Sequence, residues 1–322
     1  MKVGITGASG FIGNHLLDEF KRRDWTIRVL QHQSRISKDF PCEVVVGDIR
    51  DSSSVHKFLE GLDMVFHLAA ALGASLIAKE EFAQINTEGT KNVLKAAKEA
   101  GVQRVIHFSS AGVLGAVTRG DVAEEEYPAQ PKNVYDRTKL MAEKIVRGQA
   151  TGGMDVVTIR PGWVYGPGDR RTFKLIRAIA RGRFMLVTRG EAKQTPVYID
   201  DLVRGVMLCA ERGKAGEIYH IAGEEALQVR EIVETIASAT GRHLPRLTLP
   251  LFPIKLTAQI MEKTFLLFKK EAPLTTGRLA FFIHPKPLSI IKAKEELGFL
   301  PQTDFTTGIT QTVAWYREHG WL

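Results

Sequence analysis

The sequence has very few cysteines: only Cys42 and Cys209 occur among 322 residues. Neither has another cysteine or a histidine at the spacing of a zinc site, and one pair makes no disulfide framework. We therefore expect no bound metal and a reducing compartment, the cytoplasm. The chain also lacks a basic and then apolar leader before the strand-like segment that starts at Lys2.

The sequence has no region in which charge of one sign is massed. Its 44 Lys and Arg exceed its 36 Asp and Glu by eight, but the basic residues are scattered. Without a basic stripe or interleaved aromatic residues, a nucleic-acid interface is excluded. The composition, 44% hydrophobic and 25% charged, is that of a folded globular protein and excludes disordered and fibrous classes.

Short apolar segments of strand length alternate with helix-length segments through the first half of the chain. Runs that are apolar on both faces and separated by helices are typical of a parallel sheet covered on both sides. We therefore predict a doubly wound α/β domain. The predicted strands are Val3–Thr6, Thr26–Leu30, Glu43–Val46, Met64–Leu68, Arg104–Phe108 and Val156–Ile159, and the predicted helices are Phe11–Arg23, Ser53–Leu59, Phe82–Ala100 and Tyr135–Gln149.

The alternation breaks after about Arg160, where a Gly- and Pro-rich segment, Pro161–Gly168, begins. Two further strands near Val197–Ile199 and Ile218–Ile221 are followed by scattered helices. This change predicts a smaller α+β lobe that is interleaved with the sheet domain. We assign residues 1–161 and 198–222 to the sheet domain and residues 162–197 and 223–322 to the smaller lobe.

A glycine-rich turn, Thr6-Gly7-Ala8-Ser9-Gly10-Phe11-Ile12-Gly13, joins the first predicted strand to the first helix. Gly7 allows a tight turn, Gly10 lets a pyrophosphate approach the backbone, and Gly13 lets the helix pack closely on the strand. The start of the helix then offers N–H groups and a positive dipole to phosphates. Such glycines also occur in plain loops, but the strand before and the helix after favour a dinucleotide site.

The end of the second predicted strand distinguishes NAD from NADP. An acidic residue there would bind the ribose 2′-hydroxyl of NAD and repel a 2′-phosphate. The segment Val29–Arg35 has no acid, and Arg35, helped by Ser34 or His32, is suited to a 2′-phosphate. A solvated basic loop is the alternative reading, so we expect NADP and keep NAD open. Asp48 follows the third strand. Its carboxylate could bind the adenine amino group, or it could simply be a turn residue.

A tyrosine and a lysine four residues apart, Tyr135 and Lys139, open a predicted helix and share one of its faces. A lysine cation beside a tyrosine stabilises the phenolate and so lowers the pKa of the phenol. Ser110 follows the fifth strand, at the edge where parallel sheets place their ligands, and could bind the substrate oxygen. The alternative is that Tyr135 and Lys139 are only a pair on the helix surface. The glycine-rich turn and Ser110 at the end of a strand favour the interpretation that the three residues are catalytic.

These motifs together resemble the extended short-chain dehydrogenase/reductase family, also called the NAD-dependent epimerase/dehydratase family, over nearly the whole chain. The resemblance implies a Rossmann domain with a small C-terminal substrate lobe, and hydride transfer at C4 of a nicotinamide. The motifs that carry it are Thr6–Gly13, Asp48, His67–Ala70, Asn86–Leu94, Ser109-Ser110, Tyr135-x-x-x-Lys139, Arg160–Pro167, Tyr198–Leu202, Glu296–Pro301 and Trp315-Tyr316.

The resemblance also implies a role for each matched residue. Tyr135 would be the general acid/base, Lys139 would bind the nicotinamide ribose and lower the pKa of the tyrosine, and Ser110 would orient the substrate oxygen. The remaining matched residues would contact the dinucleotide: Gly7, Gly10, Phe11, Ile12 and Gly13 at the pyrophosphate, Asp48 and Ile49 at adenine, Leu68, Ala69 and Ala70 along the cofactor, and Pro161 and Val164 at the carboxamide.

Three departures from the family pattern narrow the chemistry. Ala111-Gly112 stand where sugar dehydratases carry an acidic pair, Thr195-Pro196 replace the Arg-Asp that grips a nucleotide diphosphate in epimerases, and Leu114 replaces a tyrosine. Arg170, Arg171, Lys193 or Arg278 could substitute for that arginine. The differences favour oxidation or reduction of a secondary alcohol or ketone in a fairly apolar substrate, as in the dihydroflavonol reductase and 3β-hydroxysteroid dehydrogenase branch.

Two other functions stay open beside this one. A nucleotide-sugar epimerase with tightly bound NAD is the alternative enzyme. A cofactor-sensing protein without catalysis is disfavoured, because a sensor needs no base and the Ser110, Tyr135 and Lys139 set is intact.

The segment Leu244–Phe268 is apolar, but its prolines and charges exclude a membrane span. From Pro253 on we predict an amphipathic helix, with Leu256, Ile260, Met261 and Leu267 on the side that packs over the substrate site. A peripheral lipid contact near Lys269-Lys270 is the alternative. The partner expected throughout is a small-molecule substrate, and the family resemblance adds a homodimer formed by the helices that begin at Phe82 and Tyr135.

Overall fold

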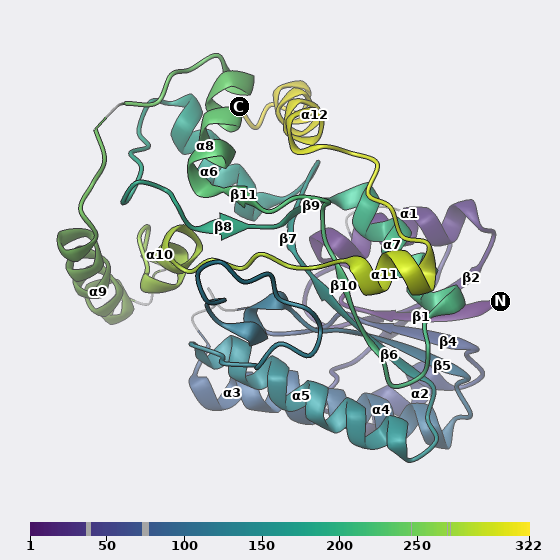
Figure 1. The fold of residues 1–322 in the computed structure, drawn as a ribbon. Coiled ribbons are helices and arrows are strands. Elements are labelled where there is room, and N and C mark those ends of the chain that lie inside the picture. The colour runs from purple at the N-terminus through teal and green to yellow at the C-terminus, as the bar shows by residue number, and fades with distance from the viewer. Residues whose placement is uncertain (37–39, 73–76, 246, 269, 271) are drawn as a thin grey trace.

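The computed structural model describes residues 1–36, 40–72, 77–245, 247–268, 270 and 272–322 (Figure 1). Its centre is a seven-stranded parallel sheet with the strand order β10-β6-β5-β4-β1-β2-β3. This order confirms the doubly wound, Rossmann-type prediction. The strands are β1 (Lys2–Thr6), β2 (Thr26–Gln31), β3 (Glu43–Val46), β4 (Met64–His67), β5 (Arg104–Phe108), β6 (Val156–Pro161) and β10 (Ile218–Ile221).

Helices cover both faces of this sheet (Figure 1). The helices α2 (Ser52–Leu59), α4 (Gly89–Glu99) and α5 (Val134–Thr151) lie on one face, and α1 (Phe11–Arg22) and α7 (Ile199–Arg212) lie on the other. Two separate hydrophobic clusters correspond to the two faces, because each strand is apolar on both sides.

One predicted helix is interrupted in the structure. The segment predicted as Phe82–Ala100 consists of α3 (Lys79–Ala83), a π-helical turn (Gln84–Glu88) and α4. A π-turn adds a residue to the helical circuit and often marks a functional position. Here it turns Asn86 toward the polypeptide that follows β4.

The smaller lobe sits beyond the carboxyl end of β6. Its strands are β7 (Trp163–Tyr165) and β9 (Pro196–Tyr198), which pair in parallel, and β8 (Lys193–Gln194) and β11 (Leu227–Gln228), which pair antiparallel. Its helices are α6 (Arg170–Ala180), α8 (Val229–Thr240), α9 (Leu251–Leu267), α10 (Thr276–Ile283) and α12 (Phe305–Glu318). The helix α11 (Ile291–Leu297) instead packs against α7 and β10 at the edge of the sheet.

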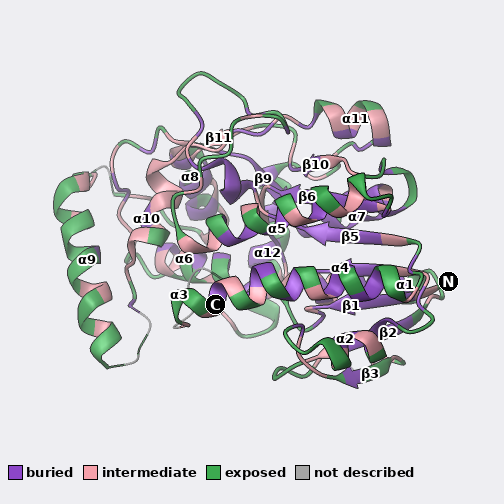
Figure 2. Ribbon diagram, turned by 90° about the horizontal axis from the view of Figure 1, so that it is seen from below, coloured by how far each residue is buried: buried purple, intermediate pink, exposed green. Residues whose placement is uncertain are grey.

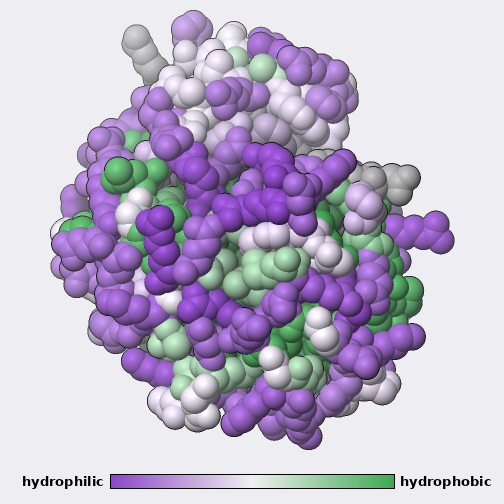
Figure 3. All heavy atoms as spheres, turned by 90° about the vertical axis from the view of Figure 1, so that its right-hand side faces the viewer, coloured by the Kyte–Doolittle hydropathy of each residue, from purple (hydrophilic) through white to green (hydrophobic). Residues whose placement is uncertain are grey.

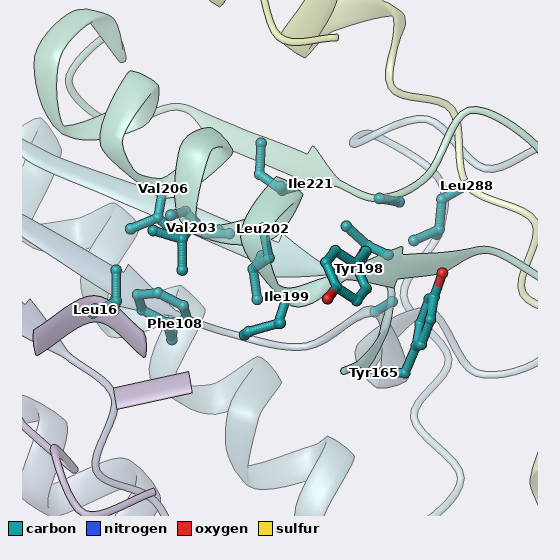
Figure 4. Packing of buried hydrophobic residues seen from close by; sticks show 14 of the residues in the cluster. Leu16, Phe108, Tyr165, Tyr198, Ile199, Leu202, Val203, Val206, Ile221 and Leu288 are labelled. Carbon is teal, nitrogen blue, oxygen red and sulfur yellow. The ribbon is translucent and has the colours of Figure 1, made fainter. Parts of the chain in front are cut away.

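The main hydrophobic cluster runs from the sheet domain into the smaller lobe. Figure 4 shows this junction, where Tyr165 of β7 and Tyr198 of β9 lie near Ile199 and Leu202 of α7. The predicted strand near Val197–Ile199 ends at Tyr198, because Ile199 begins α7. Since the two parts share one apolar core, the predicted domain boundaries stay a prediction.

Helix α9 lies differently from the prediction. Instead of packing over the site, Leu256, Ile260 and Leu267 are exposed, and Met261 is half-buried on another side of the helix. Ala258 is the buried residue of this helix. Of the two lysines at its end, Lys270 is exposed and Lys269 lies outside the described residues. No helix among the described residues has the length and apolarity to cross a bilayer.

Candidate active site

The glycine-rich turn between β1 and α1 is tightly folded against the polypeptide after β4. Gly7 has φ of 77°, a conformation that favours glycine, and a Cβ there would lie 2.8 Å from the backbone nitrogen of Ala69. A Cβ on Gly13 would lie 2.4 Å from the carbonyl oxygen of Gly7. The helix therefore starts as close to the strand as a dinucleotide turn requires.

The first turn of α1 is open to a phosphate ligand. Gly10 is its N-cap, so no side chain caps the helix, and the first turn has no acidic residue. The N–H groups at this terminus and the helix dipole favour an anion. This terminus has the features that a dinucleotide pyrophosphate needs. The predicted contacts of Gly10, Phe11, Ile12 and Gly13 with it stay predictions.

Hydrogen bonds among buried side chains fix the backbone at the ends of β1 and β4. The Thr6 hydroxyl lies 2.8 Å from Nδ1 of His67 and accepts from the backbone N–H of Ala69 at 3.1 Å. The other ring nitrogen of His67 lies 3.0 Å from the Thr90 hydroxyl. Leu68, Ala69 and Ala70 are consequently held half-buried beside the glycine turn.

Asn86 ties this segment to the helix that carries the predicted catalytic pair. Its side-chain oxygen accepts from the backbone N–H of Ala71 at 2.7 Å, and its Nδ2 donates to the Thr138 hydroxyl at 3.0 Å. Asn86 belongs to the motif Asn86–Leu94, but the sequence did not predict that its side chain holds the segment after β4 in place. Asn86 thus connects the segment after β4 to Thr138 of α5, one residue before Lys139.

The ends of β2 and β3 bring several charged residues together. Arg50 donates two hydrogen bonds to Oδ2 of Asp48, at 2.9 and 2.6 Å, and His32 lies 3.2 Å from the same oxygen. Burial raises the pKa of Asp48, but the hydrogen bonds from Arg50 outweigh it and hold the carboxyl below its usual pKa. Arg35 is exposed in the same segment, and Ile49 is buried. Sequence reasoning missed Arg50, whose bond to Asp48 depends on a local turn.

Ser110 and Tyr135 lie together at the carboxyl edge of the sheet. Ser110 caps a 3-10 turn (Ala111–Leu114), and its Oγ accepts from the N–H of Gly112 at 3.0 Å. Burial raises the pKa of the Tyr135 phenol above its ordinary value, while the charge of Arg171 and a hydrogen bond with Ser110 act to lower it. The structure thus brings the predicted serine and tyrosine into contact and adds Arg171 from α6.

Lys139 lies one turn further along α5 and is buried. Its Nζ donates to the carbonyl oxygen of Phe108, the last residue of β5, at 2.6 Å. Burial lowers the pKa of Lys139 to about 8, and the nearby carboxylate of Glu143 acts to raise it. In the described part of the chain, the groups that shift the pKa of Tyr135 are Arg171, Asp136 and Ser110, and Lys139 is not among them. The predicted lowering of the tyrosine pKa by Lys139 therefore stays a prediction.

A buried ion pair anchors α5 to the sheet. Arg160 of β6 donates to both carboxylate oxygens of Glu143, at 2.9 and 2.7 Å, and to the carbonyl oxygen of Glu125 at 2.7 Å. Both side chains are 5% exposed. Bidentate geometry of this kind fixes orientation as well as distance. The pair therefore sets the height of Tyr135 and Lys139 above the sheet edge.

Asp136 and Lys286 are charged residues near Tyr135 that sequence reasoning did not single out. Asp136 is buried, accepts from Nδ2 of Asn133 at 2.7 Å, and occupies the space that a side chain on Gly112 would need. Burial raises the pKa of Asp136, and the charge of Lys286 acts to lower it. The lack of a side chain at Gly112 therefore makes room for a carboxyl from the neighbouring helix.

The departures from the family pattern have clear structural positions. Leu114 is fully buried in the main hydrophobic cluster, so this residue does not reach a substrate. Thr195 is buried, and its hydroxyl accepts from the N–H of Leu288 at 2.9 Å. Pro161 is buried at the end of β6, and Val164 is half-buried in β7.

Of the four basic residues that could replace the missing arginine, Arg171 has a charge that acts to lower the pKa of Tyr135. The guanidinium of Arg170 lies over the ring of Trp321, 5.6 Å from its centroid. Arg278 donates to the carbonyl oxygens of Ala272 and Pro273, at 2.8 and 2.6 Å.

Residues 3–222 match the model of the NAD dependent epimerase/dehydratase family. The chain belongs to this family. Its predicted resemblance is confirmed, and the protein is an enzyme that works with a nicotinamide cofactor, NAD or NADP.

Three comparisons with known proteins cover nearly the full length. The enzyme is 30% identical to sterol demethylase protein B of Methylococcus capsulatus, with 100% of both chains covered. It is 30% identical to a 3-beta-hydroxysteroid dehydrogenase of Mycolicibacterium neoaurum, with 98% of this chain and 92% of the relative covered. A solved structure of DesIV, a dTDP-glucose 4,6-dehydratase of Streptomyces venezuelae with NAD and TYD bound, has a TM-score of 0.79 and 27% identity, with 100% and 98% covered.

Proposed function

We propose that this enzyme is an NADP-dependent oxidoreductase that interconverts a secondary alcohol and a ketone in a fairly apolar substrate. The observation that carries the proposal is the convergence of Ser110, Tyr135 and Lys139 at one sheet edge, beside an open glycine turn. The full-length similarity to a 3-beta-hydroxysteroid dehydrogenase supports it.

Each of these side chains has a distinct task. Tyr135 gives a proton to the substrate oxygen in reduction and takes it back in oxidation. Ser110 holds that oxygen by a hydrogen bond, and Arg171 places positive charge where the phenolate forms. Lys139 would hold the nicotinamide ribose. The glycine turn would hold a nicotinamide dinucleotide, which would supply or accept the hydride at the carbon that bears the substrate oxygen.

The surroundings of the site favour an apolar substrate over a sugar nucleotide. The ring of Trp163, the first residue of β7, lies 4.8 Å from that of Phe281, and the ring of Phe281 lies 5.2 Å from that of Phe282. All three rings are half-buried, so they present apolar surface on the lobe that carries the substrate. The buried Thr195 leaves no cation at the position that grips a diphosphate in epimerases.

The preference for NADP rests on the end of β2. Arg35 is exposed there, and no acidic side chain replaces it between His32 and Ile36. A guanidinium suits a 2′-phosphate, since it donates two parallel hydrogen bonds. Calorimetry should therefore show tighter binding of NADPH than of NADH, and Arg35→Ser should remove most of that difference.

The decisive experiment is hydride transfer with a panel of ketones and secondary alcohols, followed by the absorbance of NADPH. Tyr135→Phe should lower kcat by at least about 100-fold and leave NADPH binding nearly unchanged, because only the proton donor is lost. Tyr127→Phe is the matched control, since its hydroxyl bonds only with Thr118 and Asp121 at the surface. Full activity of the Tyr135 variant would overturn the proposed mechanism.

Nucleotide-sugar epimerisation is the second candidate, and Arg171 beside Tyr135 is the observation that favours it. An epimerase would retain its cofactor and show no net change in NADPH absorbance. Co-purified NAD and a rise in Tm with uridine diphosphate would then support that function.

Three further assignments belong with the proposal. The sheet domain comprises residues 1–161 and 198–222, and the substrate lobe comprises residues 162–197 and 223–322. The enzyme works in the cytoplasm and forms a homodimer through α4 and α5, where Met141 is 51% exposed. Light scattering of the wild type and of Met141→Glu tests the dimer, since a buried charge should dissociate it.

A further inference from the structure

Helix α9 carries apolar side chains on two opposite faces. The inner face packs into a small cluster in which Ala258 contacts Val187 and Leu279, with Leu251 and Ile254 beside them. The outer face carries Phe252, Leu256, Ile260 and Leu267, which are 79%, 48%, 57% and 82% exposed. Their spacing of four, four and seven residues aligns them along one side of the helix. We call these four residues the outer face of α9.

The outer face is unusual for this molecule. Figures 1 and 2 show α9 standing at one end of the smaller lobe, with mostly exposed residues along its length. Leu266 and Phe268 extend the apolar surface at its carboxyl end and are 64% and 69% exposed. The face at the other end of the molecule is hydrophilic over most of its area, with apolar areas between the hydrophilic residues (Figure 3). A contiguous apolar surface of this kind marks an interaction site.

The charges around the outer face are positive. Lys255 and Lys263 lie on α9 itself and are exposed, and Lys270 is exposed just beyond it. The acidic residue of the helix, Glu262, turns its carboxylate inward, where it accepts hydrogen bonds from Thr276. The whole chain has a formal net charge of +8. An occupant of this surface must therefore combine apolar and anionic groups.

We propose that the outer face of α9 docks the enzyme onto the surface of a membrane that contains anionic lipids. The apolar side chains would enter the boundary between headgroups and acyl chains, and Lys255 and Lys263 would meet the lipid phosphates. A second copy of the chain fits less well, because pairing of two outer faces would bring the lysines of both copies together.

The position of α9 links this surface to the catalytic residues. Helix α10 lies between them: the backbone N–H of Thr276 donates to Glu262 of α9 at 3.0 Å. At the other end of α10, the ring of Phe281 lies 4.8 Å from that of Trp163 in β7. A membrane-docked α9 would thus hold the substrate lobe beside the lipid phase, from which apolar molecules are available. The docking itself does not depend on the proposed reaction.

The test is co-sedimentation of the full chain with unilamellar vesicles. The wild type should bind vesicles of phosphatidylcholine mixed with phosphatidylglycerol and bind pure phosphatidylcholine much more weakly. Replacing the exposed leucines and isoleucine together, Leu256→Gln, Ile260→Gln and Leu267→Gln, should weaken binding by at least about tenfold. Lys255→Gln and Lys263→Gln should each weaken binding to the anionic vesicles by about fivefold.

A matched control uses exposed apolar residues elsewhere on the surface. Val46→Gln, Val122→Gln and Leu300→Gln replace residues that are 73%, 56% and 60% exposed. This triple variant should keep full vesicle binding, and circular dichroism should show that both triple variants are folded. The proposal is overturned by absence of vesicle binding, by equal losses in both triple variants, or by a concentration-dependent dimer that only the α9 variant abolishes.

Discussion

Lys139 is a charged residue that the protein buries on α5, one turn after Tyr135, the proposed general acid/base. Its pKa is lowered to about 8 by burial, from an ordinary value of 10.5. A difference of this size corresponds to about 3 kcal/mol of unfavourable free energy for the charged form in the folded state. The hydrogen bond to Phe108 offsets only part of this cost. The position of Lys139 therefore serves the site at the expense of stability.

Lys139→Met should consequently stabilise the fold at neutral pH and abolish turnover. We expect a gain of about 1 to 2 kcal/mol in the free energy of unfolding at pH 7, after the lost hydrogen bond is subtracted. The gain should shrink between pH 8 and pH 10.5, because the wild-type lysine loses its charge first in the folded state. Urea unfolding at pH 7 and at pH 10 measures it, and an equal loss of stability at both pH values would contradict the argument.

Gly13 offers a second test at the scale of one residue. A Cβ there would lie 2.4 Å from the Gly7 carbonyl oxygen, so Gly13→Ala must push α1 away from β1. Dinucleotide binding should fall by at least about tenfold, and the enzyme should lose about 1 to 3 kcal/mol of stability. Gly148→Ala is the matched control, because among the described residues nothing outside its own helical turn lies within 4 Å of a Cβ there. That helix should gain about 0.5 to 1 kcal/mol.

The secondary structure elements show what the sequence can and cannot predict. The sheet was predictable because its strands are apolar on both faces, and Gly7, Tyr135 and Lys139 were predictable because their spacing follows from the turn and the helix. The π-turn at Asn86 was not predictable, since its sequence has ordinary helical propensity and its geometry comes from hydrogen bonds to Ala71 and Thr138. The outward face of α9 was also missed, because a helix that is apolar on two sides does not indicate which side is buried.

The contact between α5 and β6 leads to a prediction for Glu143. Glu143→Gln leaves the buried guanidinium of Arg160 without its bidentate carboxylate partner. Because an unpaired buried charge is costly, the free energy of unfolding should fall by about 3 kcal/mol. Loss of the negative charge should also lower the pKa of Lys139 below about 8. The alkaline decline of kcat should therefore move to lower pH. Unchanged stability together with an unchanged pH profile of kcat would show that the pair does not position α5.

At the scale of the whole molecule, three histidines are buried in the central sheet. His67 in β4, His107 in β5 and His220 in β10 are each at most 1% exposed. Burial lowers the pKa of His67 and of His220 to about 3 and lowers that of His107 well below its ordinary value. All three are therefore neutral in the folded protein and become protonated near pH 6.5 only after unfolding.

This difference predicts a steep loss of stability in mild acid. Below about pH 6.5 the unfolded chain binds up to three more protons than the folded one, so stability should fall by about 4 kcal/mol for each pH unit. The buried Glu125 acts in the opposite direction, because burial raises its pKa and the folded state binds its proton more readily. Urea unfolding between pH 7.5 and pH 5 should show the slope, and His67→Gln, which keeps a polar partner for Thr6 and Thr90, should reduce it by about one third. A slope that His67→Gln leaves unchanged would mean that the sheet opens to solvent before its histidines are protonated.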